Sequence, residues 1–130
     1  MMDIVVTVPK PLWEAWVYEG DLPGSPEIGE VWGFFTQGPR PDIAVGERVY
    51  VVSHGRLRGY APLVELGFEP SAILDGVEHG RVVFGRRGGA VAATISEAIR
   101  GFPSWRARWW RREAEVPFPE WKTEGVSRCG

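Results

Sequence analysis

The chain has 130 residues, enough for one domain with its own core, and its 44% apolar content argues against extended disorder. No apolar run approaches the roughly 18 residues that cross a membrane. No basic segment precedes the apolar start at residues 4–8, so we expect no signal peptide. The single Cys129 allows no internal disulfide, and these features together predict a cytoplasmic protein.

The net charge of −2 hides an uneven distribution along the chain. Residues 1–39 hold six acidic residues against one Lys, whereas residues 40–112 hold twelve Arg against seven acidic residues. A basic face is therefore compatible with the near-neutral total. Arg suits phosphate and base edges, although a GC-rich or thermophilic genome would give the same excess of Arg over Lys.

Short β-branched and aromatic runs between Gly and Pro residues predict strands, and capping patterns predict helices. The first strand spans residues 4–8, and a helix follows at 12–18. The further strands are expected at 31–35, 46–52, 56–61, 81–85 and 90–93. The further helices are expected at 94–100, after a Thr-to-Glu capping box, and at 105–113, capped by Ser104.

Two hairpins are expected among these strands. The clearer one joins 46–52 to 56–61 through a turn at Ser53 to Gly55. The other joins 81–85 to 90–93. Residues 70–79, which precede it, are expected to be irregular or a helical turn.

These elements predict an α+β, β-rich fold. Five or six short strands with these turn spacings can close into a small mixed β-barrel with flanking short helices. We expect a single domain over residues 1–130, of which 122–130 form a loose C-terminal tail.

Three segments resemble the PUA-like superfamily, in particular its ASCH and EVE type domains. They are the strand and helix from Ile4 to Gly20, the strand start from Val45 to Val51, and the return strand from Gly55 to Ala61. The resemblance implies a compact PUA-like barrel that binds RNA, single-stranded nucleic acid or a modified nucleobase in a cleft beside the barrel. The ASCH signature with its proposed catalytic lysine has no counterpart in residues 29–37, so no catalytic residue carries over.

The most unusual segment, residues 102–112, interleaves four aromatic residues with four Arg. Single-strand recognition uses such a mixture, because Arg neutralises phosphates and aromatic rings stack on bases. On the expected helix, Trp105 and Trp109 share the core face. Trp110 lies off that stripe, so Trp110 and Arg106 are predicted to contact the ligand. The alternative is that the tryptophans form core and the arginines pair with acidic residues.

Four more residues complete the predicted base-binding set: Trp32, Thr36, Arg56 and Arg58. Trp32 would form the aromatic wall of a base pocket, and Thr36 would hydrogen-bond a base edge from a strand end. Arg56 and Arg58 are two apart and would point to one face, where Arg48 of the partner strand would join them in a basic strip for phosphates. Each of these residues also has a structural alternative. Trp32 would be barrel core, Thr36 would be part of an ordinary turn, and the arginines would lie on a solvated sheet face.

Two other classes of function remain open. One is a small hydrolase acting on a modified nucleoside or RNA, with Glu65, Glu47 or His54 as general base. The other is a protein-interaction or oligomerisation module, in which the many tryptophans form an interface. The two His are far apart in the sequence and there is one Cys, so no metal-binding pattern is present. We also expect no cofactor.

Overall fold

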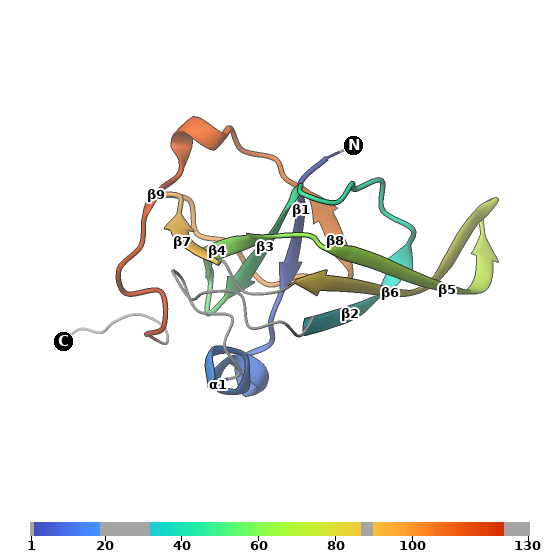
Figure 1. The fold of residues 1–130 in the computed structure, drawn as a ribbon, viewed down its shortest axis with the longest axis horizontal. Coiled ribbons are helices and arrows are strands. Elements are labelled where there is room, and N and C mark those ends of the chain that lie inside the picture. Colours follow the sequence, from blue (N-terminus) through green and yellow to red (C-terminus); the bar gives the residue numbers. More distant parts are fainter. Residues whose placement is uncertain (1, 19–31, 87–89, 124–130) are drawn as a thin grey trace.

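The computed structural model describes residues 2–18, 32–86 and 90–123, and short strands make up most of it (Figure 1). In chain order the elements are β1 (Ile4–Thr7), α1 (Lys10–Tyr18), β2 (Trp32–Pro39), β3 (Arg48–Ser53), β4 (Arg56–Pro62), β5 (Glu65–Leu74), β6 (Val77–Arg86), β7 (Val91–Thr94), β8 (Trp105–Ala107), the 3₁₀-helix η1 (Arg112–Ala114) and β9 (Val116–Pro117). The chain is α+β and β-rich, as the sequence predicts. None of the helices within these ranges has the length and apolarity of a membrane span.

The strands form two sheets, and within the described ranges neither closes into a barrel. The larger sheet has the order β8-β1-β3-β4-β7-β9. It is mixed, because β1 pairs with β3 in parallel while its other pairs are antiparallel. The smaller sheet, β2-β6-β5, is antiparallel.

The main core includes side chains from both sheets and α1. Its buried members from β1, β3 and β6 are Ile4, Val6, Val49, Val51, Val82 and Phe84. From α1, Trp13 is 1% exposed and meets Trp121 edge to face at 5.7 Å. Burying such a side chain contributes about 1.5–3 kcal/mol, so this core dominates stability.

The opposite face of the larger sheet carries a second, smaller core. Its members are Val5, Tyr50, Val52, Leu57, Ile95, Ile99 and Trp110. An irregular segment, residues 95–104, covers this face. Its backbone is fixed to the sheet, because the Ile99 N–H donates to the Gly55 carbonyl (2.8 Å) and the Phe102 N–H donates to Thr7 Oγ1 (3.1 Å).

The predicted helix at 94–100 is wrong. Thr94 stays in β7, paired with Val116, and its hydroxyl donates to the Ile95 carbonyl (3.3 Å) rather than to a helix N-terminus. Burial of Ile95 and Ile99 in the second core outweighs the local capping pattern.

The predicted helix at 105–113 is also wrong. Ser104 has φ 63°, whereas an N-cap residue normally has extended backbone. The three residues that follow it form β8, which pairs with β1. Only the single 3₁₀ turn η1 is helical in this region.

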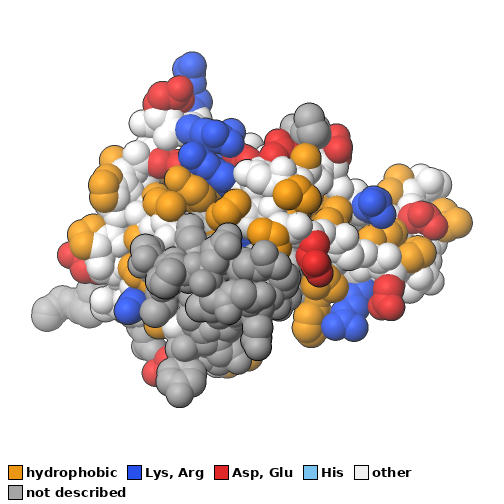
Figure 2. All heavy atoms as spheres, viewed as in Figure 1, with side chains coloured by type: hydrophobic (Ala, Val, Ile, Leu, Met, Phe, Trp, Pro, Cys, Tyr) orange, Lys and Arg blue, Asp and Glu red, His pale blue; other side chains and the backbone are white. Residues whose placement is uncertain are grey.

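Residues 70–79, expected to be irregular, form the tip of a long hairpin that projects from the body (Figures 1 and 2). Asp75 and Gly76 make its turn with φ of 52° and 77°, which suits a two-residue hairpin loop. The predicted pairing of 81–85 with 90–93 is wrong, because β7 pairs with β4 and β9 instead of β6.

Candidate nucleic-acid site

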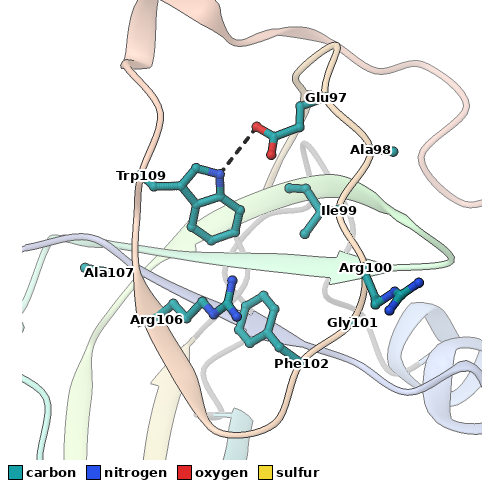
Figure 3. A pocket seen from close by; sticks show the side chains of 9 residues that line it. All are labelled: Glu97, Ala98, Ile99, Arg100, Gly101, Phe102, Arg106, Ala107 and Trp109. Atoms are coloured by element: carbon teal, nitrogen blue, oxygen red, sulfur yellow. Dashed lines mark hydrogen bonds between the residues drawn. The ribbon is translucent and has the colours of Figure 1, made fainter.

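An open hollow of about 470 Å³ lies between the irregular segment and β8 (Figure 3). The residues that line it are Glu97, Ala98, Ile99, Arg100, Gly101, Phe102, Arg106, Ala107 and Trp109. Both walls are anchored to the larger sheet, one through Ile99 and Phe102 and the other through the pairing of β8 with β1. The hollow is therefore held by ordered backbone on both sides.

Two aromatic rings and one guanidinium make up the centre of the hollow. Phe102 is half-buried and Trp109 is 41% exposed, and their ring centroids lie 6.1 Å apart in an edge-on arrangement. The Arg106 Cζ lies 4.6 Å from the Phe102 centroid and 5.7 Å from the Trp109 centroid. The exposed indole and the guanidinium offer flat surfaces on which a planar guest can stack.

The charged side chains of the hollow are open to solvent. Arg100 and Arg106 are exposed, and neither forms an ion pair within the described part of the chain. Glu97 is also exposed, and its Oε1 accepts a hydrogen bond from Trp109 Nε1 (3.4 Å). Two positive charges against one negative charge favour an anionic guest.

The prediction that Trp110 is the exposed ring is wrong, and Trp109 is exposed instead. Trp110 is 8% exposed, meets Tyr50 edge to face at 5.2 Å, and donates from Nε1 to Glu115 Oε2 (2.8 Å). Burial, and then the Glu115 carboxylate, raise the pKa of Tyr50 well above its ordinary value, so this phenol stays protonated and also donates to Glu115. The helix assumed in that prediction does not form: β8 ends at Ala107, and Trp109 and Trp110 follow it outside any helix or strand.

Arg58 was predicted to contact phosphate, but it is 1% exposed. The β3–β4 register shifts between Val51, which pairs with Gly59, and Val52, which pairs with Leu57, so Arg58 is the extra residue of a bulge. Its guanidinium donates to the carbonyls of Ser53 (2.9 Å), Trp121 (3.0 Å) and Thr123 (2.5 Å). Burial, with a smaller effect from Arg56, lowers its pKa to about 10. Arg58 therefore links β3 to the C-terminal segment at residues 121–123 and is not available to a ligand.

The expected basic strip of Arg48, Arg56 and Arg58 does not form. Arg56 is exposed, but it lies over the Phe118 ring (4.5 Å) and Thr94 rather than beside the hollow. Arg48 is half-buried and pairs with Glu115 at 3.2 Å.

Trp32 and Thr36 belong to β2 of the smaller sheet, and Thr36 does not line the hollow. The backbone of Trp32 pairs with Arg86, and its side chain is outside the described residues. Thr36 is half-buried and pairs with Val82; because β2 continues to Pro39, Thr36 is interior to the strand rather than at its end. Among the predicted contact residues whose side chains the structure describes, Arg106 alone lines the hollow.

A buried carboxylate holds two arginines of the aromatic segment. Asp3 accepts hydrogen bonds from the Arg48 N–H (3.0 Å), Arg108 Nε (3.0 Å) and Arg112 Nη2 (2.8 Å). Burial by itself raises the pKa of Asp3, but these hydrogen bonds and the charge of Arg112 outweigh it, and the net pKa is lowered. The alternative reading, in which arginines pair with acidic residues of the N-terminal third, is confirmed for Arg108 and Arg112.

Sequence reasoning missed Glu97 and Arg100 as candidate contacts and placed Trp109 in the core, whereas Trp109 is 41% exposed. Alternation in the run Trp105 to Trp109 favours a strand, but it also places Trp105 and Trp109 on one face, so it does not identify Trp109 as the exposed ring.

The candidate general bases are dispersed. Glu47 accepts the Ala44 N–H (2.8 Å) before β3, His54 lies in the turn after β3 with φ 53°, and Glu65 begins β5 in the other sheet. Among the described residues no cluster of three His, Cys, Asp or Glu could hold a metal ion. Neither family models, nor curated proteins, nor solved structures gave a match to this chain.

Replacing Arg58 by Ala should lower the free energy of unfolding by about 3 kcal/mol, because the carbonyls of Ser53, Trp121 and Thr123 lose a charged donor. Arg56→Ala is the matched control, since Arg56 contacts the same Phe118 ring from an exposed position, and it should cost under about 1 kcal/mol. Urea unfolding measures both. Equal losses in the two variants would contradict the assigned role.

Asp3→Asn should cost about 2 kcal/mol near pH 7, because it removes a charged acceptor from two arginines. The folded pKa of Asp3 is below its ordinary 3.8, so its stabilising effect is present above that pH and is lost as the pH falls through the folded pKa. The difference in the free energy of unfolding between the wild type and Asp3→Asn should therefore become smaller at acidic pH. Urea unfolding at neutral pH and near pH 3 checks this, with exposed Glu113→Gln as control. A gap independent of pH would refute it.

Proposed function

We propose that this chain binds nucleic acid, either RNA or another single strand, or a modified nucleobase, at the hollow around Trp109, Phe102 and Arg106. The observation that carries the proposal is the exposed indole of Trp109 beside the Arg106 guanidinium, which forms no ion pair with any residue that the structure describes. A base stacks on the indole or on the guanidinium, and Arg100 and Arg106 attract the phosphates.

The size and openness of the site support this reading. A hollow of about 470 Å³ has the volume of a small-molecule site, and its open side admits a continuing strand. The resemblance to PUA-like domains belongs to the same proposal: it implies a β-rich domain whose ligand lies in a cleft beside the strands. Binding of this kind needs no covalent chemistry.

Trp109→Ala should weaken binding of a labelled single-stranded RNA about tenfold, because one stacking surface is lost. Arg106→Ala should weaken it and reduce the slope of log affinity against log salt by about one. Fluorescence polarisation at several salt concentrations measures both effects.

Arg81→Ala is the matched control for these variants. Arg81 also lies over an aromatic ring, that of Phe35 at 4.2 Å, but in the smaller sheet. The affinity of Arg81→Ala for the labelled RNA should stay within about twofold of the wild-type affinity. A wild-type affinity that does not change with salt, or equal losses in all three variants, would count against the proposal.

A second candidate function is self-association through the projecting hairpin. Its tip exposes Ile73 (70%), Leu74 (53%) and Val77 (49%). Figure 2 shows hydrophobic side chains at the end of this arm. β5 is an edge strand of the smaller sheet, so a second copy can pair with it and cover these side chains. The tryptophan interface considered from the sequence has less support, because Trp13, Trp110 and Trp121 are buried.

Light scattering tests the second candidate. The wild type should be a dimer, and Ile73→Lys should be a monomer with unchanged unfolding, because the introduced charge would be buried at the interface. A wild type that stays monomeric at high concentration rejects self-association.

A further inference from the structure

We propose that the hollow prefers guanine to the other bases, with the Glu97 carboxylate as the selecting group. This inference rests on the function proposed above and adds the identity of the base. Glu97 lies at one end of the hollow, beside the indole of Trp109, while Arg106 lies at the other end beside Phe102 (Figure 3).

Glu97 is held in place by a hydrogen bond, and its carboxylate can accept further hydrogen bonds. Within the described residues its only hydrogen bond comes from Trp109 Nε1, at 3.4 Å, and it forms no ion pair there. An ionised carboxylate has about four lone-pair sites and no donor. The Oε2 atom and most of the lone pairs are therefore open to a guest that stacks beside the indole.

Among the four RNA bases, guanine alone has two adjacent donors on its Watson–Crick edge, the N1–H and the N2 amino group. A carboxylate accepts both at once. Adenine and cytosine place a ring acceptor beside their amino donor, and uracil flanks its single N–H with two carbonyls. Each of these would turn a lone pair toward the negative carboxylate, which is unfavourable.

The distribution of charge excludes the other natural guest for an aromatic site with a carboxylate, which is an organic cation. Arg100 and Arg106 line the same hollow and would repel it. The site suits a guest with donors on one edge and negative charge elsewhere. Guanine carrying a phosphate has both properties, whether it is part of a strand or a free nucleotide.

Competition between short oligonucleotides tests the preference. The probes are oligouridine strands of equal length in which the central base is G, A, C, U or hypoxanthine, together with GMP. The G strand should bind about tenfold or more tightly than the A, C and U strands. Hypoxanthine keeps the N1–H but lacks the amino group, so its strand should fall between them. Displacement of the G strand by GMP as strong as by the unlabelled G strand assigns the free nucleotide as ligand, and weaker displacement assigns the strand.

Glu97→Gln should reduce the ratio of G to U affinity several-fold, because Gln replaces one acceptor with a donor. Glu113→Gln is the matched control: Glu113 is exposed and pairs with Arg111 outside the hollow, so the ratio should not change. Equal affinity for all strands in the wild type, or a preference retained by Glu97→Gln, overturns the guanine inference while the proposed function stands. No binding of any strand or of GMP overturns the proposed function itself.

Discussion

Both faces of β1 are buried, and the rest of the fold depends on that constraint. Ile4, Val5 and Val6 are each 0% exposed, so each face of the larger sheet needs a cover. One face packs against the smaller sheet, whereas the other is covered by the irregular segment 95–104. A cover made of irregular chain packs less continuously than a sheet, and the hollow beside β8 is the gap that it leaves.

Burial also determines which arginines are accessible to a ligand. For this reason the Arg-rich part of the sequence does not form one basic face. Arg58 and Arg86 are buried, and Arg108 and Arg112 are held by Asp3. Arg106 remains open beside aromatic rings. Composition gives the number of guanidinium groups, whereas their availability depends on which of them the fold pairs with Asp3 or with backbone carbonyls.

The parts of the fold that were predictable are those where local pattern and burial agree, as in the β-branched run of β1 and the hairpin of β3 and β4. The long hairpin was missed although Asp75-Gly76 is a strong two-residue turn signal, because strand residues around it are exposed and lack alternation. For the site, the composition of residues 102–112 was informative, but helical periodicity assigned Trp109 and Trp110 to the wrong environments. The exposed ring is determined by tertiary packing after β8, where Trp110 enters the second core against Tyr50.

The contacts between the two ends of the described chain have a consequence for biosynthesis. Trp13 packs on Trp121, its Nε1 donates to the Lys122 carbonyl (3.3 Å), and Arg58 donates to the carbonyls of Trp121 and Thr123. The core around α1 is therefore completed by residues made more than a hundred positions later. A chain emerging from the ribosome must keep its first helix without these partners until residues 121–123 have been made, which makes these long-range contacts a late step of folding.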